Sequence, residues 1–313
     1  MDPQRTLVIV NPAARNGQVG RDWTQLQALL ESALGPCHFE HTQRAGHAAE
    51  MAHKAALGSD FDTVLSMGGD GTHGDVINGL MNAQVSPDKI AFGPLPTGTG
   101  GDFCRLIEGD RDLEATAKAL RASKGTLIDV GEAIYQGLDG KEASRYFLNM
   151  ASCGMNGLVD KLVNTSSKRL GGKLSFFLAT ARARMVYKPV RADLLIDGET
   201  VGQWTIDSIC ACNGRFAGGG MLFAPNASLN DGLLDVVVTA VASFPYQLRM
   251  MQRVYEGTHD QMDHIHTFRG AHIEVRPLME KAYMDIDGEY TGIAPAQFIA
   301  RPSRLTLLGL KSA

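Results

Sequence analysis

The sequence predicts an α/β protein with two domains: an N-terminal doubly wound parallel sheet with helices on both faces, and a C-terminal antiparallel, sandwich-like β domain. Three observations lead to this prediction. Strand and helix patterns alternate from Thr6 to Gly131. Glycine-rich segments follow two apolar strands, at residues 68–72 and 96–103. Beyond residue 133 the alternation gives way to short strands separated by Gly, Asn and Asp turns, as in antiparallel sheets.

Apolar runs predict the strands of the first domain. Residues 6–10, Thr-Leu-Val-Ile-Val, lack polar alternation, as expected for a parallel strand buried on both faces. Apolar residues at helical spacing predict the helices between the strands. In chain order we expect strands at 6–10, 39–42, 62–67, 90–95 and 125–131, and helices at 23–34, 45–57, 73–82 and 113–122. Ligands of such a sheet bind at the carboxyl ends of its strands.

Alternating apolar and polar residues predict the strands of the second domain. We place the domain boundaries at residues 1–132 and 133–299. Within the second domain we expect strands at 145–150, 191–196, 204–211, 233–241 and 273–275, and helices at about 157–187 and 244–256.

Composition narrows the class of protein. Of the 313 residues, 44% are hydrophobic and 20% charged, which is ordinary for a globular protein. Lys and Arg number 30 against 34 Asp and Glu, and aromatic residues do not interleave with basic ones, so nucleic-acid binding is not expected. Five scattered cysteines indicate reduced thiols, and no signal peptide or apolar run of ~18 residues is evident, so we expect a cytoplasmic protein.

The two glycine-rich segments predict a phosphate site. Gly68-Gly-Asp-Gly-Thr72 ends one strand, and Pro96-Thr-Gly-Thr-Gly-Gly-Asp-Phe103 ends the next. Glycine lets backbone N–H groups approach an anion, and a helix that follows adds its positive end. An aspartate in such a turn can hold a metal ion or take a proton. Neither segment is a P-loop or a dinucleotide-binding Gly-x-Gly-x-x-Gly motif, so we expect a different nucleotide site.

At this point the chain resembles a known family, the diacylglycerol kinase catalytic domain, and more closely the bacterial soluble lipid kinases. The two glycine-rich segments carry the resemblance together with Asn78-Gly-Leu80. Further matching segments are spread over nearly the whole chain: Asn11-Pro-Ala-Ala, residues 42–48, Phe147-Leu-Asn-Met-Ala151, Cys212 to Gly220, Pro225 to Asp235, and Asp285-Ile-Asp-Gly-Glu289. In this family the last segment returns to the first domain, which implies that residues 300–313 rejoin residues 1–132.

The resemblance implies a set of site residues. Glu289 matches the general base for the lipid hydroxyl, Asp70 shares the catalytic site, and Asp102 and Asp129 would hold a catalytic Mg²⁺. The side chain of Asp231 and the carbonyls of Ser228 and Leu233 match a structural Mg²⁺ site. The implied ATP-binding residues are Asn11, Thr42, Gly68, Gly69, Asp70, Gly71, Thr72, His73, Gly74, Gly98 and Thr99.

Simpler interpretations of three of these sites stay open. Asp129 also suits a strand-end residue that caps a turn, and Glu289 suits an ordinary hairpin residue after Asp287-Gly288. Asn230-Asp231-Gly is equally a good turn without a metal. The chain also departs from the family pattern at Gly101, where Asn is usual, and at Asp75, where Glu is usual; both leave nucleotide preference open.

We therefore expect an ATP- and Mg²⁺-dependent lipid kinase, a phosphotransferase of lipid metabolism whose acceptor is a membrane lipid, most simply diacylglycerol giving phosphatidic acid. Alternatives are a kinase of ceramide, sphingosine or phosphatidylglycerol, an NAD kinase, or a regulator that binds nucleotide or lipid without turnover. Residues 161–191 hold eight Lys and Arg and no acid, which favours peripheral contact with an anionic membrane as much as a solvated basic face. An exposed sheet edge would also allow a homodimer.

Overall fold

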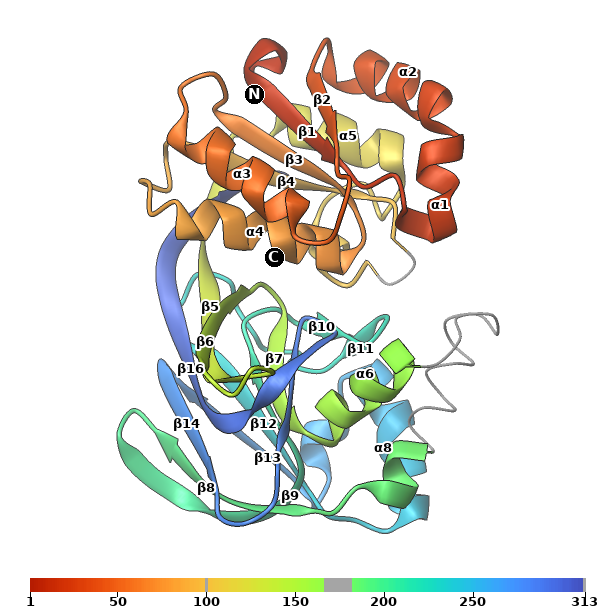
Figure 1. The fold of residues 1–313 in the computed structure, drawn as a ribbon. Helices are drawn as coiled ribbons and strands as arrows, with labels where there is room; N and C mark the ends of the chain where they lie inside the picture. Colours follow the sequence, from red (N-terminus) through yellow and green to blue (C-terminus); the bar gives the residue numbers. More distant parts are fainter. Residues whose placement is uncertain (99–100, 166–181, 312–313) are drawn as a thin grey trace. The chain divides into compact units, whose positions relative to one another are not determined.

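The computed structural model describes residues 1–98, 101–165 and 182–311. These residues form two compact units, one of residues 1–130 with 302–313 and the other of residues 131–301 (Figure 1). The boundaries expected from sequence, 132/133 and 299/300, lie two residues from these. The long strand β16 (Glu289–Leu307) pairs with strands of both units, so one continuous hydrogen-bonded sheet includes strands of each.

A parallel sheet forms the centre of the first unit. Its strand order is β2–β1–β3–β4, and every pairing along it is parallel. The end of β16 joins beside β4 through Thr306 and Leu307, so the C-terminus contributes to the first sheet. Residues 6–10 are all buried, as the apolar run predicts. The strands are β1 (Thr6–Val10), β2 (His38–His41), β3 (Thr63–Gly68) and β4 (Ala91–Pro96).

Two pairs of helices cover this sheet. Helices α3 and α4 pack on each other, as do α2 and α5, and Figure 1 shows the two pairs on opposite faces. The doubly wound arrangement is therefore confirmed. The helices are α1 (Ala14–Arg21), α2 (Trp23–Leu34), α3 (His47–Leu57), α4 (Asp70–Asn82) and α5 (Leu113–Ala122), with short 3-10 turns η1 (Pro3–Arg5) and η2 (Phe103–Leu106).

Antiparallel strands form the second unit, and two long strands close it. The first half of β9 pairs with β8 and its second half with β7. In the same way β16 pairs first with β15 and then with β14. Because β8 also pairs with β14, and β7 with β15, the hydrogen bonding returns on itself around a core of buried aliphatic residues. The predicted sandwich-like domain is confirmed.

The remaining elements follow in chain order; β5 begins in the first unit and β16 ends there. They are β5 (Thr126–Gly137), β6 (Glu142–Phe147), β7 (Met150–Gly154), α6 (Met155–Thr165), β8 (Val190–Ile196), β9 (Glu199–Cys212), β10 (Phe216–Ala217), β11 (Met221–Leu222), β12 (Leu234–Ala240), α8 (Phe244–Glu256), η4 (His259–Gln261), β13 (Ile265–Gly270), β14 (His272–Pro277), β15 (Tyr283–Ile286) and β16 (Glu289–Leu307).

Two sequence-based boundaries need correction. The helix expected from residue 73 begins at Asp70, because the glycine turn leads directly into it. The single strand expected at 145–150 is two strands, β6 and β7, since the amides between them turn toward the Asp287 carboxylate. Within the helix expected at about 157–187, residues up to Thr165 and residues 182–186 are helical, and residues 166–181 lie outside the described residues.

Hydropathy gives a separate result. Among the described helices, none is both long enough and apolar enough to cross a bilayer.

The tight packing of α3 on α4 gives a stability prediction. A Cβ at Gly79 would overlap the carbonyl oxygen of Ala49, so we expect Gly79→Ala to lower the free energy of unfolding by about 1–3 kcal/mol through overpacking. Gly58→Ala is the matched control, because its Cβ would meet only ordinary contacts. Urea unfolding of both variants measures the difference, and equal stability would contradict the packing argument.

Candidate active site

The predicted nucleotide-binding residues follow the carboxyl ends of four parallel strands. Asn11 follows β1, Thr42 follows β2, Gly69 follows β3, and Gly98 lies two residues beyond the end of β4. The chain runs outward from β1 to β2 and then returns to the other side of β1 with β3. Such a reversal opens a crevice at the carboxyl ends of the strands, which is where α/β sheets of this kind bind ligands.

The two glycine-rich segments lie against each other. A Cβ on Gly98 would stand 2.5 Å from the Cα of Gly69, and one on Gly68 would collide with the side chain of Thr72. The N–H and hydroxyl of Thr97 both donate to the carbonyl of Gly68, at 3.2 Å each. Gly98 is therefore required for the two turns to approach, and Gly68 for the close contact with Thr72 within the first segment. Thr99 lies outside the described residues.

Asp70 ties the second segment to the first. It is the first residue of α4, and its carboxylate accepts hydrogen bonds from the N–H groups of Gly101 at 2.8 Å and of Asp102 and Phe103 at 3.3 Å. The expected metal or proton role of Asp70 stays a prediction. The contacts assign this carboxylate a further task, which is to fix the conformation of residues 101–103.

Asn11 closes the first segment from the side of β1. Its amide nitrogen donates to Oγ1 of Thr72 at 2.9 Å, and its own N–H donates to the carbonyl of Met67 at 2.9 Å. The carbonyl oxygen of its side chain accepts from the N–H of Ala13. Asn11 therefore links the ends of β1 and β3 to the first turn of α4.

His73 is placed differently from the other predicted ATP-binding residues. Its ring is buried, with Nδ1 2.5 Å from Oγ of Ser66 and Nε2 3.5 Å from Sγ of Cys104. Burial lowers the pKa of His73 to about 4, so the ring is neutral near pH 7. Any contact of this residue with a nucleotide would have to use its main chain. Sequence reasoning missed the Ser66–His73–Cys104 cluster, because Cys104 lies 31 residues beyond His73.

Asp102 and Asp129 are both buried in the first unit. Oδ1 of Asp102 lies 3.5 Å from Nε of Arg105. Asp129 accepts a hydrogen bond from the N–H of Ser303 at 2.8 Å, and Ser303 has a positive φ of 53°. This hydrogen bond supports the turn-capping interpretation of Asp129. The Mg²⁺ role of Asp102 and Asp129 stays a prediction.

Glu289 begins β16, directly after the β15–β16 turn. Oε2 of Glu289 forms an ion pair with Nη1 of Arg145 at 2.8 Å, and the Glu289 side chain is 43% exposed. Asp287 anchors the turn, because its carboxylate accepts hydrogen bonds from three consecutive N–H groups, those of residues 148–150. Burial raises the pKa of Asp287 to about 6 in spite of these donors. The turn therefore presents an accessible carboxylate on a fixed backbone.

A second buried acid supports the same turn. Asp285 accepts from the N–H of Gly288 at 2.8 Å and from the hydroxyl of Ser152 at 3.2 Å, and it hydrogen-bonds Asp160 of α6. Burial and the nearby Asp160 raise the pKa of Asp285, and burial raises that of Asp160 to about 6. Two carboxyl groups this close share a proton near neutral pH. An aspartate inside the apolar strand β15 is the one sequence signal for this pair.

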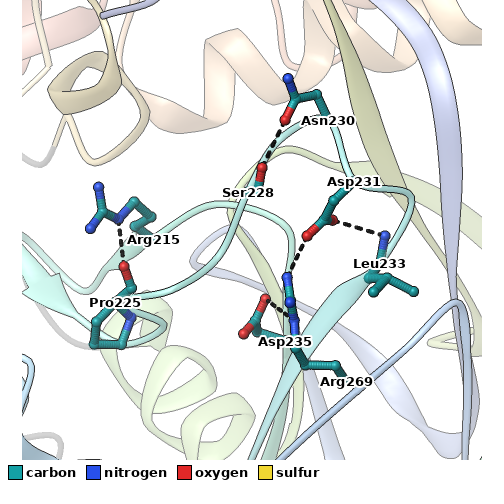
Figure 2. A network of polar contacts seen from close by, with 8 residues as sticks. All are labelled: Arg215, Pro225, Ser228, Asn230, Asp231, Leu233, Asp235 and Arg269. Carbon is teal, nitrogen blue, oxygen red and sulfur yellow. Dashed lines mark hydrogen bonds and ion pairs between the residues drawn. The ribbon is translucent and has the colours of Figure 1, made fainter. Parts of the chain in front are cut away.

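The expected structural metal site is a turn before β12, and Figure 2 shows its contacts. One oxygen of Asp231 accepts from the N–H of Leu233 at 3.1 Å, and the other pairs with Arg269. Arg269 also lies 3.4 Å from Asp235, and the hydroxyl of Ser228 donates to Asn230.

The donor chemistry of this turn fits Mg²⁺. Carboxylate and carbonyl oxygens are its preferred ligands, and a carboxylate has about four lone-pair positions, so the two N–H contacts of Asp231 leave acceptor capacity. Asp231 with the carbonyls of Ser228 and Leu233 would hold such an ion, which would brace the turn. Among the described residues no group of three or more His, Cys, Asp or Glu side chains is arranged around a metal position, so the site stays a prediction.

Comparison with known proteins identifies the family. Residues 5–133 match the profile of the diacylglycerol kinase catalytic domain, and residues 149–309 match that of the YegS C-terminal NAD kinase beta sandwich-like domain. The second match covers more than half of the chain, so the chain belongs to the family with this C-terminal domain, which it combines with a diacylglycerol kinase catalytic domain. Members of this lipid kinase family are phosphotransferases that act on an alcohol group, and the expectation of a kinase is confirmed.

Individual relatives align over most of their length. The kinase is 28% identical to diacylglycerol kinase of Bacillus subtilis over 298 residues, which cover 95% of this chain and 93% of that one. It is also 28% identical to diacylglycerol kinase of Mycobacterium tuberculosis over 268 residues, covering 84% and 81%.

Solved structures share the fold. The crystal structure of a diacylglycerol kinase from Bacillus anthracis str. Sterne superposes with a TM-score of 0.71 at 21% identity, covering 98% of this chain and 97% of that one. Yeast NADH kinase complexed with NADH superposes with a TM-score of 0.55 at 12% identity, covering 100% and 85%. At these identities the likeness shows the fold alone.

The contacts of Asp70 give a prediction for the kinase. Asp70→Asn keeps the shape of the side chain but replaces one carboxylate oxygen with an NH₂ group. The carboxylate accepts hydrogen bonds from three N–H groups, and the amide has only one oxygen to do so. We therefore expect the free energy of unfolding to fall by about 1–3 kcal/mol. Asp60→Asn, an exposed site, is the control. Hydrogen exchange at residues 101–103 reports on the second segment, and unchanged protection would contradict the capping role.

The Asp160–Asp285 pair predicts how stability depends on pH. The folded pKa of Asp160, about 6, exceeds its unfolded value, so the folded state binds more protons and stability falls as pH rises from about 4 to about 6. Asp160→Asn removes this ionisation, so we expect a shallower fall in that window, by up to about 1.4 kcal/mol per pH unit. Urea unfolding at several pH values measures it, and parallel curves for variant and wild type would contradict a raised pKa.

Proposed function

We propose that this kinase transfers the γ-phosphate of ATP to a hydroxyl of a membrane lipid, with diacylglycerol giving phosphatidic acid as the first candidate reaction. One observation carries most of the proposal: two glycine-rich segments, held together by Asp70, end neighbouring parallel strands where phosphates bind. Glu289 adds an accessible carboxylate on a braced turn. The names of the relatives support diacylglycerol as the acceptor.

The proposed reaction needs little covalent chemistry from the protein. The lipid hydroxyl oxygen attacks the γ-phosphorus, the bond to the β–γ bridging oxygen breaks, ADP leaves, and Glu289 takes the hydroxyl proton. Mg²⁺, held by Asp102 and Asp129 in this proposal, would neutralise the phosphate charges. Backbone N–H groups of the first segment and the positive end of α4 would orient the phosphates. Taking the proton with a positioned base is typically worth ~10²–10⁴-fold in rate.

The acceptor must be reached at a membrane, so we propose peripheral contact from the cytoplasmic side. Most of the basic segment expected to serve this contact, residues 161–191, lies outside the described residues. Lys161, Arg182, Arg184, Lys188 and Arg191 belong to the described part, and Arg184 pairs with Asp207 at 2.9 Å. No described contact specifies a homodimer, so that expectation stays open.

A lipid panel tests the reaction class and the acceptor together. Transfer of labelled γ-phosphate with Mg²⁺ would be followed in mixed micelles that hold diacylglycerol, ceramide, sphingosine or phosphatidylglycerol, with NAD as the aqueous acceptor. We expect label on diacylglycerol. Label on another lipid would correct the acceptor, and label on NAD would assign the chain to the NAD kinases. ATP binding without label on any acceptor would favour a regulator without turnover.

A substitution at Glu289 tests the base. We expect Glu289→Gln to lower kcat by about 10²-fold or more, since the amide cannot take the proton, and to leave ATP affinity within about twofold, since the substitution touches no predicted nucleotide contact. Glu199→Gln, at the exposed start of β9, is the control. Loss of ATP binding together with turnover, measured by calorimetry, would argue against the base assignment.

A further inference from the structure

A hollow with a volume of about 340 Å³ lies within the second unit, formed by the β5–β6 turn, α6, β15 and β16. Two lysines and two tyrosines contribute to its wall: Lys161, Lys281, Tyr283 and Tyr290. None of the described residues that line it is acidic. The hollow therefore has the size and charge to take an anionic group, and neither the glycine-rich segments nor Glu289 belongs to its wall.

The wall is held in place by close packing. The ammonium group of Lys161 lies 4.9 Å from the ring centroid of Tyr283 and 5.3 Å from that of Tyr290, within cation–π range. Gly157, one turn earlier on α6, lets the helix approach β15, since a Cβ there would stand 2.5 Å from the carbonyl of Tyr283. A Cβ on Gly292 would overlap the carbonyl of Gln136. Helix and strands are thus in contact around the hollow.

Exposed apolar side chains flank it. Leu138 in the β5–β6 turn is 70% exposed and also lines the hollow. Leu278 and Met279, in the segment that leads to Lys281, are 44% and 89% exposed. Apolar side chains on two neighbouring turns, with lysine and tyrosine beside them, are typical of surfaces that meet the bilayer interface, where tyrosine is enriched.

We propose that this hollow binds the headgroup of an anionic phospholipid and so docks the kinase on the membrane. The phosphate would lie against the ammonium groups of Lys161 and Lys281, and Leu138 and Met279 would enter the interface. Asp139 and Glu280, on the same two turns, are outside the wall. The proposal rests on the proposed lipid kinase function and names the surface through which the enzyme reaches its substrate.

Vesicle binding tests whether the two lysines contribute to docking. Co-sedimentation with vesicles of phosphatidylcholine, and of equimolar phosphatidylcholine and phosphatidylglycerol, would compare wild type with the double variant Lys161→Gln and Lys281→Gln. Each basic residue near an anionic surface strengthens binding several-fold, so we expect affinity for the anionic vesicles to fall about tenfold or more. The control is Lys141→Gln, an exposed lysine of the same turn outside the wall. Wild-type binding by the double variant would overturn the proposal.

A second variant tests whether the exposed apolar side chains contribute to docking. It also keeps the proposal testable if the double variant fails to fold. Leu138→Ser should weaken vesicle binding, whereas Leu57→Ser, at a 57% exposed position of the first unit, should not. An equal effect of both would overturn the proposal. Glycerol phosphate in solution should not compete at concentrations well above those of the lipid phosphate, and full competition would assign the hollow to a free phosphate compound instead.

Activity measurements separate this proposal from the proposed function. We expect the double variant to show a raised apparent KM for vesicle-borne acceptor and an unchanged kcat on acceptor dispersed in neutral detergent. Loss of activity in both media would overturn docking in favour of a role in turnover. If the wild-type protein shows no kinase activity, and the double variant still binds vesicles more weakly than wild type, the proposed function is refuted and docking is supported.

Discussion

Backbone amides held by part-buried aspartates determine the shape of the turns that carry the candidate site residues. Asp70 accepts three N–H groups of the second glycine-rich segment, and Asp287 accepts the three consecutive N–H groups of residues 148–150. A buried carboxylate is costly unless it is hydrogen-bonded, and amides in a turn are equally costly when unpaired. The carboxylate accepts the hydrogen bonds that the turn amides need to donate, so the turns adopt one conformation without regular secondary structure.

The same principle links segments distant in sequence. Residues 148–150 and 287 are more than 130 positions apart, as are Asp129 and Ser303. The second of these contacts lies where the chain returns to the first unit, and its partner Ser303 has a positive φ. A carboxylate there holds a backbone conformation that few residues other than glycine adopt, which allows β16 to pair with strands of both units.

The elements that follow local rules could be predicted from the sequence. Helices 23–34, 113–122 and 244–256 have the bounds expected from apolar periodicity, and the buried strand 6–10 follows from its unbroken apolar run. The glycine-rich segments could be located because each ends such a strand. What they contact could not be predicted, because Asp70 contacts residues 101–103 and His73 contacts Cys104, about 30 positions later.

Side-chain pairs in the second unit could not be predicted from the sequence either, because the paired residues are distant in the chain. Nothing near Glu289 in the sequence points to Arg145, and nothing near Asp231 points to Arg269. Strand register brings these pairs together, and register depends on the whole sheet. The split of the expected strand 145–150 is a further example, because a single distant carboxylate, that of Asp287, decides it.

The departure from the family pattern at Gly101 can be understood from the backbone. Gly101 has a φ of +61°, in the left-handed region where Asn is several-fold enriched among residues with a side chain. Family members with Asn at this position can therefore adopt the conformation that Gly adopts freely. The N–H of Gly101 donates to Asp70 at 2.8 Å, the shortest of the three contacts in that cap. Gly at this position therefore keeps the N–H contact with Asp70 and lacks the side chain that Asn would offer, so the cap on residues 101–103 does not depend on an Asn side chain.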